Sequence, residues 1–131
     1  GVTGNDWSEI IYHADENMLE LNWLSSSESM GDAGSMATLM QLTWQAETLR
    51  PTKLFIDATN FKHQVGESVM VWRKANVLPR YSAAGVKKFG FYIPGFPHSV
   101  ESGTEPTVEE GATFVTGWFS DKANALTWLN K

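Results

Sequence analysis

The chain has 131 residues, a common length for one domain, and its 42% hydrophobic content is enough to form a core and argues against disorder. Its ten Lys and Arg residues and formal net charge of -5 leave few cations to release counterions from a phosphate backbone. We therefore expect a single domain over residues 1–131, with residues 1–7 as a flexible tail, and no nucleic-acid partner.

No apolar run approaches the roughly 20 residues that a membrane-spanning helix needs. The segment from Gly1 to Trp7 lacks the basic and apolar parts of a signal peptide. The absence of cysteine excludes disulfides, thiolate nucleophiles and zinc-thiolate sites. We expect a cytoplasmic protein with no membrane span.

The first regular elements predicted are two strands, residues 8–13 and 18–24, joined by a polar connection of hairpin length. In the second strand, large apolar residues alternate with polar ones: Leu19, Leu21 and Trp23. This alternation predicts one buried and one solvated face, so we expect an antiparallel hairpin at the margin of a sheet.

A helix is predicted next, after a stretch rich in Ser, Gly and Asp. Either Asp32 or Ser35 is placed to cap its amino end, and Pro51 ends it. Its apolar residues recur at spacings of three and four: Leu39, Leu42, Ala46 and Leu49. The spacing predicts one buried stripe along the helix.

Two continuous apolar runs, Leu54 to Asp57 and Lys88 to Ile93, are typical of strands covered on both faces. The segment from Glu67 to Leu78 between them is predicted to be helical, ending at Pro79. Its buried face is expected to hold three apolar residues: Val71, Ala75 and Leu78. A strand, helix and strand of this length predict a right-handed crossover and parallel pairing.

The stretch from Pro94 to Ala112 is the least regular, and Thr107 to Glu110 is expected to form one helical turn within it. A last strand is predicted over residues 113–119, and a final helix begins at Ser120-Asp121. The predicted fold is α/β, a mixed sheet with an amino-terminal antiparallel hairpin and helices packed on it, in the order ββαβαββα.

Catalytic and cofactor motifs are absent from the sequence. The three histidines are scattered, and no G-x-S-x-G, G-x-G-x-x-G or G-x-x-x-x-G-K-[ST] motif follows a predicted strand. The adjacent carboxylates Glu109 and Glu110 are best explained by a solvated loop. We predict no metal, no cofactor and no enzymatic activity.

Polar residues cluster where the first parallel strand ends. Asp57 closes that strand, and open α/β sheets bind ligands beyond the carboxyl ends of their strands. The same loop and the next helix start hold four further candidates for a ligand- or partner-binding site: Asn60, His63, Gln64 and Ser68. The alternative is that Asp57 and Asn60 only hydrogen-bond local backbone in an Asx turn.

Three stretches resemble the SpoIIAA-like family of small bacterial proteins, which also appear as STAS/SEC14-type domains: residues 53–61, 78–89 and 118–129. The resemblance extends from about Glu16 to the end of the chain and implies a mixed sheet with helices packed on it. Related anti-sigma-factor antagonists carry a phosphorylatable Ser in an Asp-Ser-Ser-Gly pattern. The comparable residues here, 63–68, lack this pattern and place Ser68 out of register.

The leading functional hypothesis is a non-enzymatic binding or regulatory module that presents residues 57–68 and 94–112 to a protein partner. The alternative is a carrier of a small apolar or lipid-like ligand, as the SEC14 side of the resemblance suggests. It is motivated by apolar residues on the predicted helices: Met36, Met40, Trp44, Met70 and Trp72. An enzyme using Asp57 or His63 is a third hypothesis, and exposed aromatic residues leave homodimerisation open.

Overall fold

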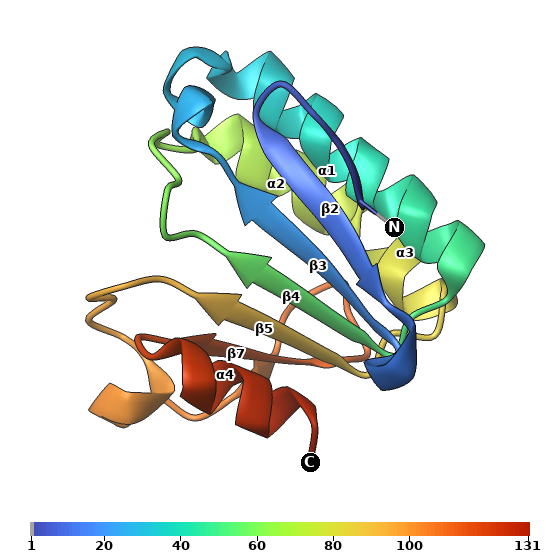
Figure 1. The fold of residues 1–131 in the computed structure, drawn as a ribbon, viewed down its shortest axis with the longest axis vertical. Coiled ribbons are helices and arrows are strands. Elements are labelled where there is room, and N and C mark those ends of the chain that lie inside the picture. Colours follow the sequence, from blue (N-terminus) through green and yellow to red (C-terminus); the bar gives the residue numbers. More distant parts are fainter. Residues whose placement is uncertain (1) are drawn as a thin grey trace.

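The computed structural model describes residues 2–131 and shows a seven-stranded mixed sheet in the order β1-β2-β3-β4-β5-β7-β6 (Figure 1). The strands are β1 (Val2–Asn5), β2 (Ser8–His13), β3 (Met18–Trp23), β4 (Lys53–Asp57), β5 (Lys88–Tyr92), β6 (Thr107–Val108) and β7 (Val115–Phe119). The α-helices in this part of the chain are α1 (Gly31–Leu49), α2 (Glu67–Asn76), α3 (Leu78–Ala83) and α4 (Lys122–Leu129).

The predicted α/β class and mixed sheet are confirmed. Strands β2 and β3 form the antiparallel hairpin, and β4 pairs with β5 in parallel. Strand β3 also pairs in parallel with β4, and β5 with β7. The four central strands therefore all end at the same edge of the sheet, from which the loops after β4 and β5 emerge (Figure 1).

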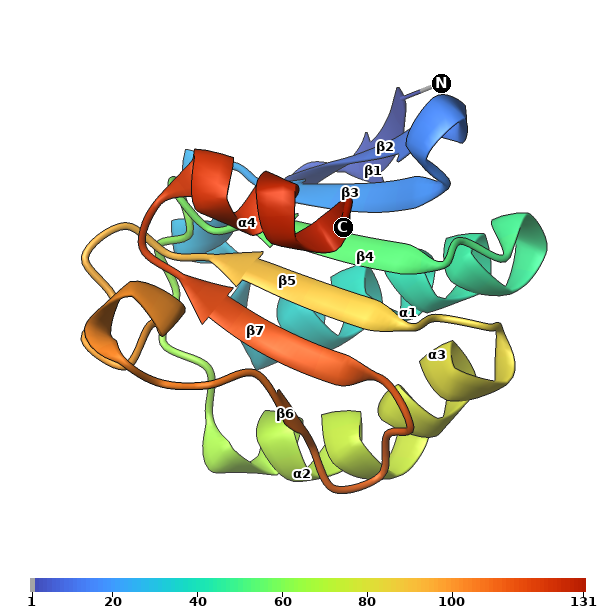
Figure 2. The ribbon, with the colours of Figure 1, turned by 90° about the horizontal axis from the view of Figure 1, so that it is seen from below.

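Helices cover both faces of the sheet (Figure 2). Helices α1, α2 and α3 lie on one face over the larger core, which includes Leu21, Leu54 and Phe89. Helix α4 lies on the other face over a smaller core, which includes Phe55 and Leu129. Within residues 2–131, no helix combines the length and the hydrophobicity that crossing a membrane requires.

The expected flexible tail is wrong for residues 2–5, which form β1 and pair with β2; Gly1 lies outside the described residues. Asn5 explains this order. Its Oδ1 accepts hydrogen bonds from the Trp7 backbone and the Ser8 hydroxyl, which closes the turn into β2. Its Nδ2 donates to Thr38 on α1 at 2.9 Å, so the turn is fixed to the helix layer.

The solvated face expected for β3 is also wrong. The strand is flanked by β2 and β4, and Met18, on the polar side, belongs to the core beneath α4. Glu20 on that side is buried and lies 2.7 Å from His13 Nε2. Covering by α4 thus makes β3 an interior strand on both faces.

Three further features expected around the helices differ in the structure. Helix α1 begins at Gly31 after Met30, and neither Asp32 nor Ser35 makes a capping hydrogen bond to it. Pro79 lies in the first turn of α3 instead of ending α2, a position where its missing N–H costs nothing. Thr107 and Val108 extend along β7 as β6 instead of forming a helical turn.

Of the three residues predicted for the buried face of α2, Leu78 is buried at the start of α3, but Val71 and Ala75 are wrong, because Val71 is 62% exposed and Ala75 is exposed. The helix instead buries Val69 and Arg73, and Val77 directly after it is also buried. These positions are four residues apart and share a face. The hydrophobic pattern does not reveal this buried face, because its central residue is an arginine.

Two glycines lie opposite each other beneath α4, Gly90 in β5 and Gly117 in β7. A Cβ at Gly90 would approach Leu129 Cδ1 to 3.1 Å, and one at Gly117 would approach the Phe119 ring to 2.9 Å. The missing side chain at Gly90 therefore lets Leu129 of α4 lie close against the sheet, and the one at Gly117 leaves room for the Phe119 ring.

The orientation of α2 gives a test of stability with a matched control. Val69→Ala is expected to lower the free energy of unfolding by about 2 kcal/mol, because it removes two buried methyl groups and leaves a void. Val71→Ala is expected to change it by no more than about 0.5 kcal/mol, because its side chain is exposed. Urea unfolding of both variants measures this; equal losses would contradict the placement of α2.

Candidate ligand-binding cavity

A cavity of about 200 Å³ lies between the sheet and helices α1 and α2. The residues that line it from the strands stand at the carboxyl half of β3, β4, β5 and β7: Trp23, Ile56, Phe91 and Trp118. Leu39 of α1 and Val69 of α2 form the opposite wall. Met70 also lines the cavity and is 40% exposed, so the cavity reaches the surface beside α2.

Aromatic rings form much of the cavity wall. Trp23 and Phe61 lie with ring centroids 4.9 Å apart, and Phe91 stacks on Trp118 at 6.1 Å with an interplanar angle of 12°. Flat rings of this kind offer large apolar contact area with few rotatable bonds. The wall therefore suits a compact, flat apolar molecule.

One ion pair interrupts this apolar lining. Arg73 of α2 and Glu109, next to β6, both line the cavity, and their side chains are only 8% and 13% exposed. Arg73 Nη1 donates to Glu109 Oε1 at 3.2 Å, and Nη2 donates to Oε2 at 3.4 Å. Removing one partner alone would leave a buried charge, which typically costs about 3–5 kcal/mol.

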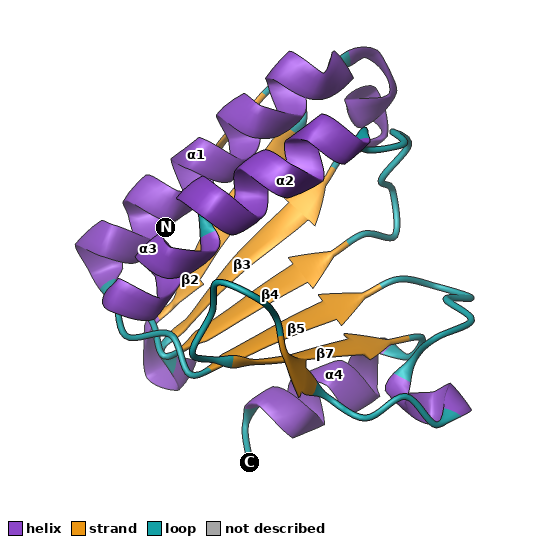
Figure 3. Ribbon diagram, turned by 180° about the vertical axis from the view of Figure 1, so that it is seen from behind, coloured by secondary structure: helices purple, strands orange, loops and turns teal. Residues whose placement is uncertain are grey.

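Glu109 reaches Arg73 because its segment folds back onto the helix face. Figure 3 shows β6 and the loop after it on the side of the sheet that carries α2. The Thr116 hydroxyl donates to Glu109 Oε2 at 3.2 Å, and the backbone N–H of Thr113 donates to Ser82. The solvated loop expected for Glu109 and Glu110 thus holds only for Glu110, which is exposed.

Asp57 lies on the face of the sheet opposite the cavity. Its Oδ1 accepts hydrogen bonds from the backbone N–H and the hydroxyl of Thr59, and its Oδ2 pairs with Lys122 Nζ of α4 at 3.1 Å. Burial by itself raises the pKa of Asp57, but these partners outweigh it and hold that pKa below its usual range. The bond to Thr59 is the Asx turn that the alternative interpretation describes.

The other four predicted residues lie along the loop and the start of α2. His63 Nε2 is 3.0 Å from Asp32 Oδ1 in the first turn of α1, and the Asn60 carbonyl accepts from the Ser27 hydroxyl. Gln64 and Ser68 are exposed. The structure therefore joins His63 to α1 and Asp57 to α4, on opposite faces, and none of the five predicted residues lines the cavity.

Sequence reasoning missed Arg73 and the role of Glu109. The signal for Arg73 was present, because Val69, Arg73 and Val77 recur at a spacing of four in a segment predicted to be helical. An arginine within an apolar stripe indicates a buried cation that needs a partner. No pattern pointed to Glu109 as that partner, because the two residues meet only through the fold.

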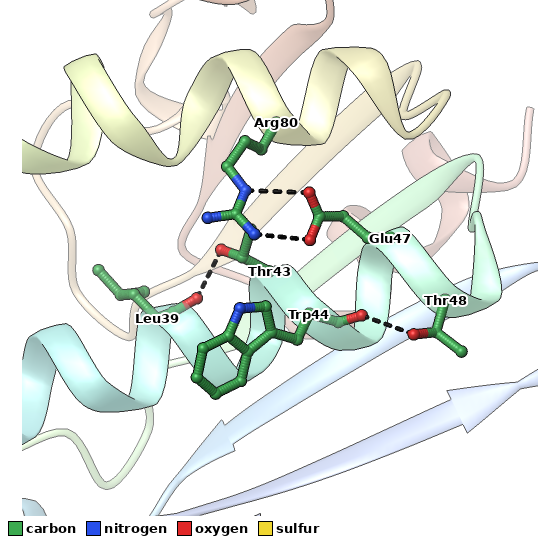
Figure 4. A network of polar contacts seen from close by, with 6 residues as sticks. All are labelled: Leu39, Thr43, Trp44, Glu47, Thr48 and Arg80. Atoms are coloured by element: carbon green, nitrogen blue, oxygen red, sulfur yellow. Dashed lines mark hydrogen bonds and ion pairs between the residues drawn. The ribbon is translucent and has the colours of Figure 1, made fainter.

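The exposed aromatic residue that bears on homodimerisation is Trp44 of α1, which is 57% exposed (Figure 4). One turn further along, Glu47 makes two hydrogen bonds to Arg80 of α3, at 2.7 and 2.9 Å. These bonds hold the pKa of Glu47 below its usual range. Trp44 thus lies on α1 one turn before the charged pair that links α1 to α3.

Glu101 ties the loop after β5 to the start of α4. Its carboxylate accepts hydrogen bonds from the backbone N–H groups of Ser120 and Asp121 and from the Asn124 side-chain amide, at 3.0 to 3.1 Å. Burial opposes ionisation, yet these three donors lower the pKa of Glu101 to about 2. The carboxylate also faces the positive end of the helix dipole.

This lowered pKa predicts a pH-dependent contribution to stability. An ionised Glu101 stabilises the fold above its ordinary pKa of 4.5, and the contribution is lost as the pH falls from 4.5 toward 2. Glu101→Gln is therefore expected to be less stable than the parent at pH 7, with the difference shrinking across that window. Urea unfolding from pH 7 to pH 2 measures it, with Glu105→Gln in the same loop as the control. A difference independent of pH would contradict the assignment.

Among residues 2–131, no three His, Asp or Glu side chains are grouped so as to hold a metal ion. Comparisons with protein-family models, with curated proteins and with solved structures found no match to this chain. The resemblance to the SpoIIAA-like family therefore stays a prediction from sequence.

Proposed function

We propose that the protein is a non-enzymatic binding domain that takes a small apolar molecule in the cavity between the sheet, α1 and α2. The observation that carries the proposal is the cavity itself, lined by four aromatic rings. It lies at the carboxyl ends of parallel strands, the usual place of ligands in open α/β sheets. The proposal follows the alternative drawn from the sequence, a carrier of an apolar ligand.

The size of the cavity narrows the class of ligand. Ligand pockets typically measure about 300–1,000 Å³, and an apolar cavity of about 150 Å³ is enough to bind benzene. At about 200 Å³ this cavity suits a molecule of one or two rings, or a short branched chain, better than a long acyl chain. A compact apolar ligand is therefore favoured over a membrane lipid.

A protein partner at residues 57–68 and 94–112 remains a second prediction. Both segments leave the same edge of the sheet (Figure 1). Several of their side chains are already engaged within the chain, since Asp57 binds Lys122, His63 binds Asp32 and Glu101 accepts from the backbone N–H of Asp121. The cavity wall is mostly apolar and offers free aromatic surface beside its one internal ion pair, so it supports ligand binding more strongly than these loops support docking.

The proposal is tested with naphthalene-2-carboxamide, a flat neutral probe. Adding it to nitrogen-15-labelled protein is expected to shift the indole N–H signals of Trp23 and Trp118, which line the cavity. Ala58→Phe places a ring at the cavity wall and is expected to abolish the shifts. Ala123→Phe, exposed on α4 at the opposite face, is the matched control and is expected to bind as the parent does. No shift in the parent, or equal shifts in all three proteins, would overturn the proposal.

A further inference from the structure

The cavity contains a cation whose position is unusual. Of the residues that line it, only Ser35, Arg73 and Glu109 have polar side chains. Arg73 enters from α2, and its guanidinium carbon lies 5.8 Å and 5.7 Å from the ring centroids of Phe89 and Phe91. The guanidinium thus lies against a pair of stacked phenylalanine rings at the wall of an otherwise apolar space.

The hydrogen bonds between Glu109 and this guanidinium are longer than is usual for oppositely charged groups. Charge-assisted hydrogen bonds between a cationic N–H and a carboxylate usually measure about 2.7–2.9 Å. The two bonds here measure 3.2 and 3.4 Å. The pair neutralises the buried charge without reaching the close bidentate geometry that Arg80 and Glu47 achieve at 2.9 and 2.7 Å.

The segment that carries Glu109 is lightly attached to the fold. Strand β6 has two residues, pairs only with β7 at the margin of the sheet, and exposes both side chains. By contrast, Arg73 is buried in the last turn of α2, one turn after Val69, which is buried as well. Glu109 also accepts from the Thr116 hydroxyl, but its two-residue strand at the sheet margin opens at a lower cost than α2, so Glu109 is the member of the pair that can be displaced.

We infer that the ligand is a carboxylate on a compact aromatic or apolar body, and that its carboxylate binds the Arg73 guanidinium in place of Glu109. The inference rests on the proposed function, because it takes the cavity as the ligand site. The apolar body lies against the rings of Phe91 and Trp118, and the carboxylate receives the two parallel N–H groups of the guanidinium. In the structure, Glu109 supplies the carboxylate that the ligand replaces.

The experiment compares two probes of nearly equal shape by titration calorimetry at pH 7: naphthalene-2-carboxylate and naphthalene-2-carboxamide. The parent protein is expected to bind the carboxylate about ten- to hundredfold more tightly, the factor that a hydrogen bond to a charged group is typically worth. Glu109→Gln removes the competing carboxylate and leaves the Arg73 charge without a counter-ion, so its fold is first checked by carboxamide binding. It is then expected to tighten naphthalene-2-carboxylate by a further factor of about ten, with the carboxamide little changed. Glu110→Gln removes the same charge from the exposed neighbouring residue and is expected to change neither affinity.

Arg73→Ala alone leaves Glu109 buried without a partner and is a poor test, since it threatens folding. The double variant Arg73→Met with Glu109→Gln removes both charges at similar volume. It is expected to lose the preference for the carboxylate and to keep carboxamide binding, which also shows that it is folded.

The outcomes separate the inference from the function on which it rests. Equal affinity of the parent for both probes, or a carboxylate preference that survives in the double variant, would overturn the Arg73 assignment and leave the apolar cavity as the ligand site. Binding of neither probe by the parent would overturn both.

Discussion

Parallel pairing of four adjacent strands is the constraint from which the rest of this structure follows. Parallel sheets bury both faces, so β3, β4, β5 and β7 need cover above and below. Helix α4 supplies it on one side and α1 to α3 on the other (Figure 2). Helices α1 to α3 run along the β2–β4 half of the sheet, and the segment around β6 lies over the other half of the same face (Figure 3). The cavity lies where these helices meet the segment around β6.

A gain in folding stability does not explain the buried ion pair of Arg73 and Glu109. Replacing a buried ion pair by apolar side chains of similar volume is often neutral or stabilising. A pair such as methionine and leucine would close the gap between α2 and β6 at least as well as Arg73 and Glu109 do. The guanidinium instead gives an otherwise apolar cavity one directional group, which is how small-molecule sites usually achieve specificity.

The sequence predicted the parts of the fold that depend on local pattern. The apolar run ending in Asp57, the hairpin and the start of α4 at Asp121 were all evident, because each depends on neighbouring residues. The face of α2 was misassigned because Val71 and Ala75 look like a core stripe, whereas tertiary packing selected the stripe through Arg73. The sequence did not predict that residues 2–5 form an ordered strand, because this depends on a hydrogen bond from Asn5 to a helix more than thirty residues away.

The sequence placed the candidate site at the edge of the sheet where the cavity lies, but none of its five residues lines that cavity. The cavity lies at the carboxyl ends of parallel strands, the edge at which open α/β sheets usually bind ligands. The polar residues chosen there divide between the two faces, as Asp57 and His63 show. Lining residues such as Phe91 and Trp118 are apolar and carry no chemical signature in a single sequence.

The paired glycines beneath α4 give the two faces of the sheet a mechanical link. Gly90 precedes Phe91, and Gly117 precedes Trp118, so each glycine adjoins a ring that lines the cavity on the other face. A methyl group at Gly90 would press on Leu129, and one at Gly117 on the Phe119 ring, so either the neighbouring side chain or the strand has to give way. Where the strand gives way, a substitution that never touches the cavity alters the spacing of its stacked rings, so steric fit on one face of the sheet bears on the shape of the other.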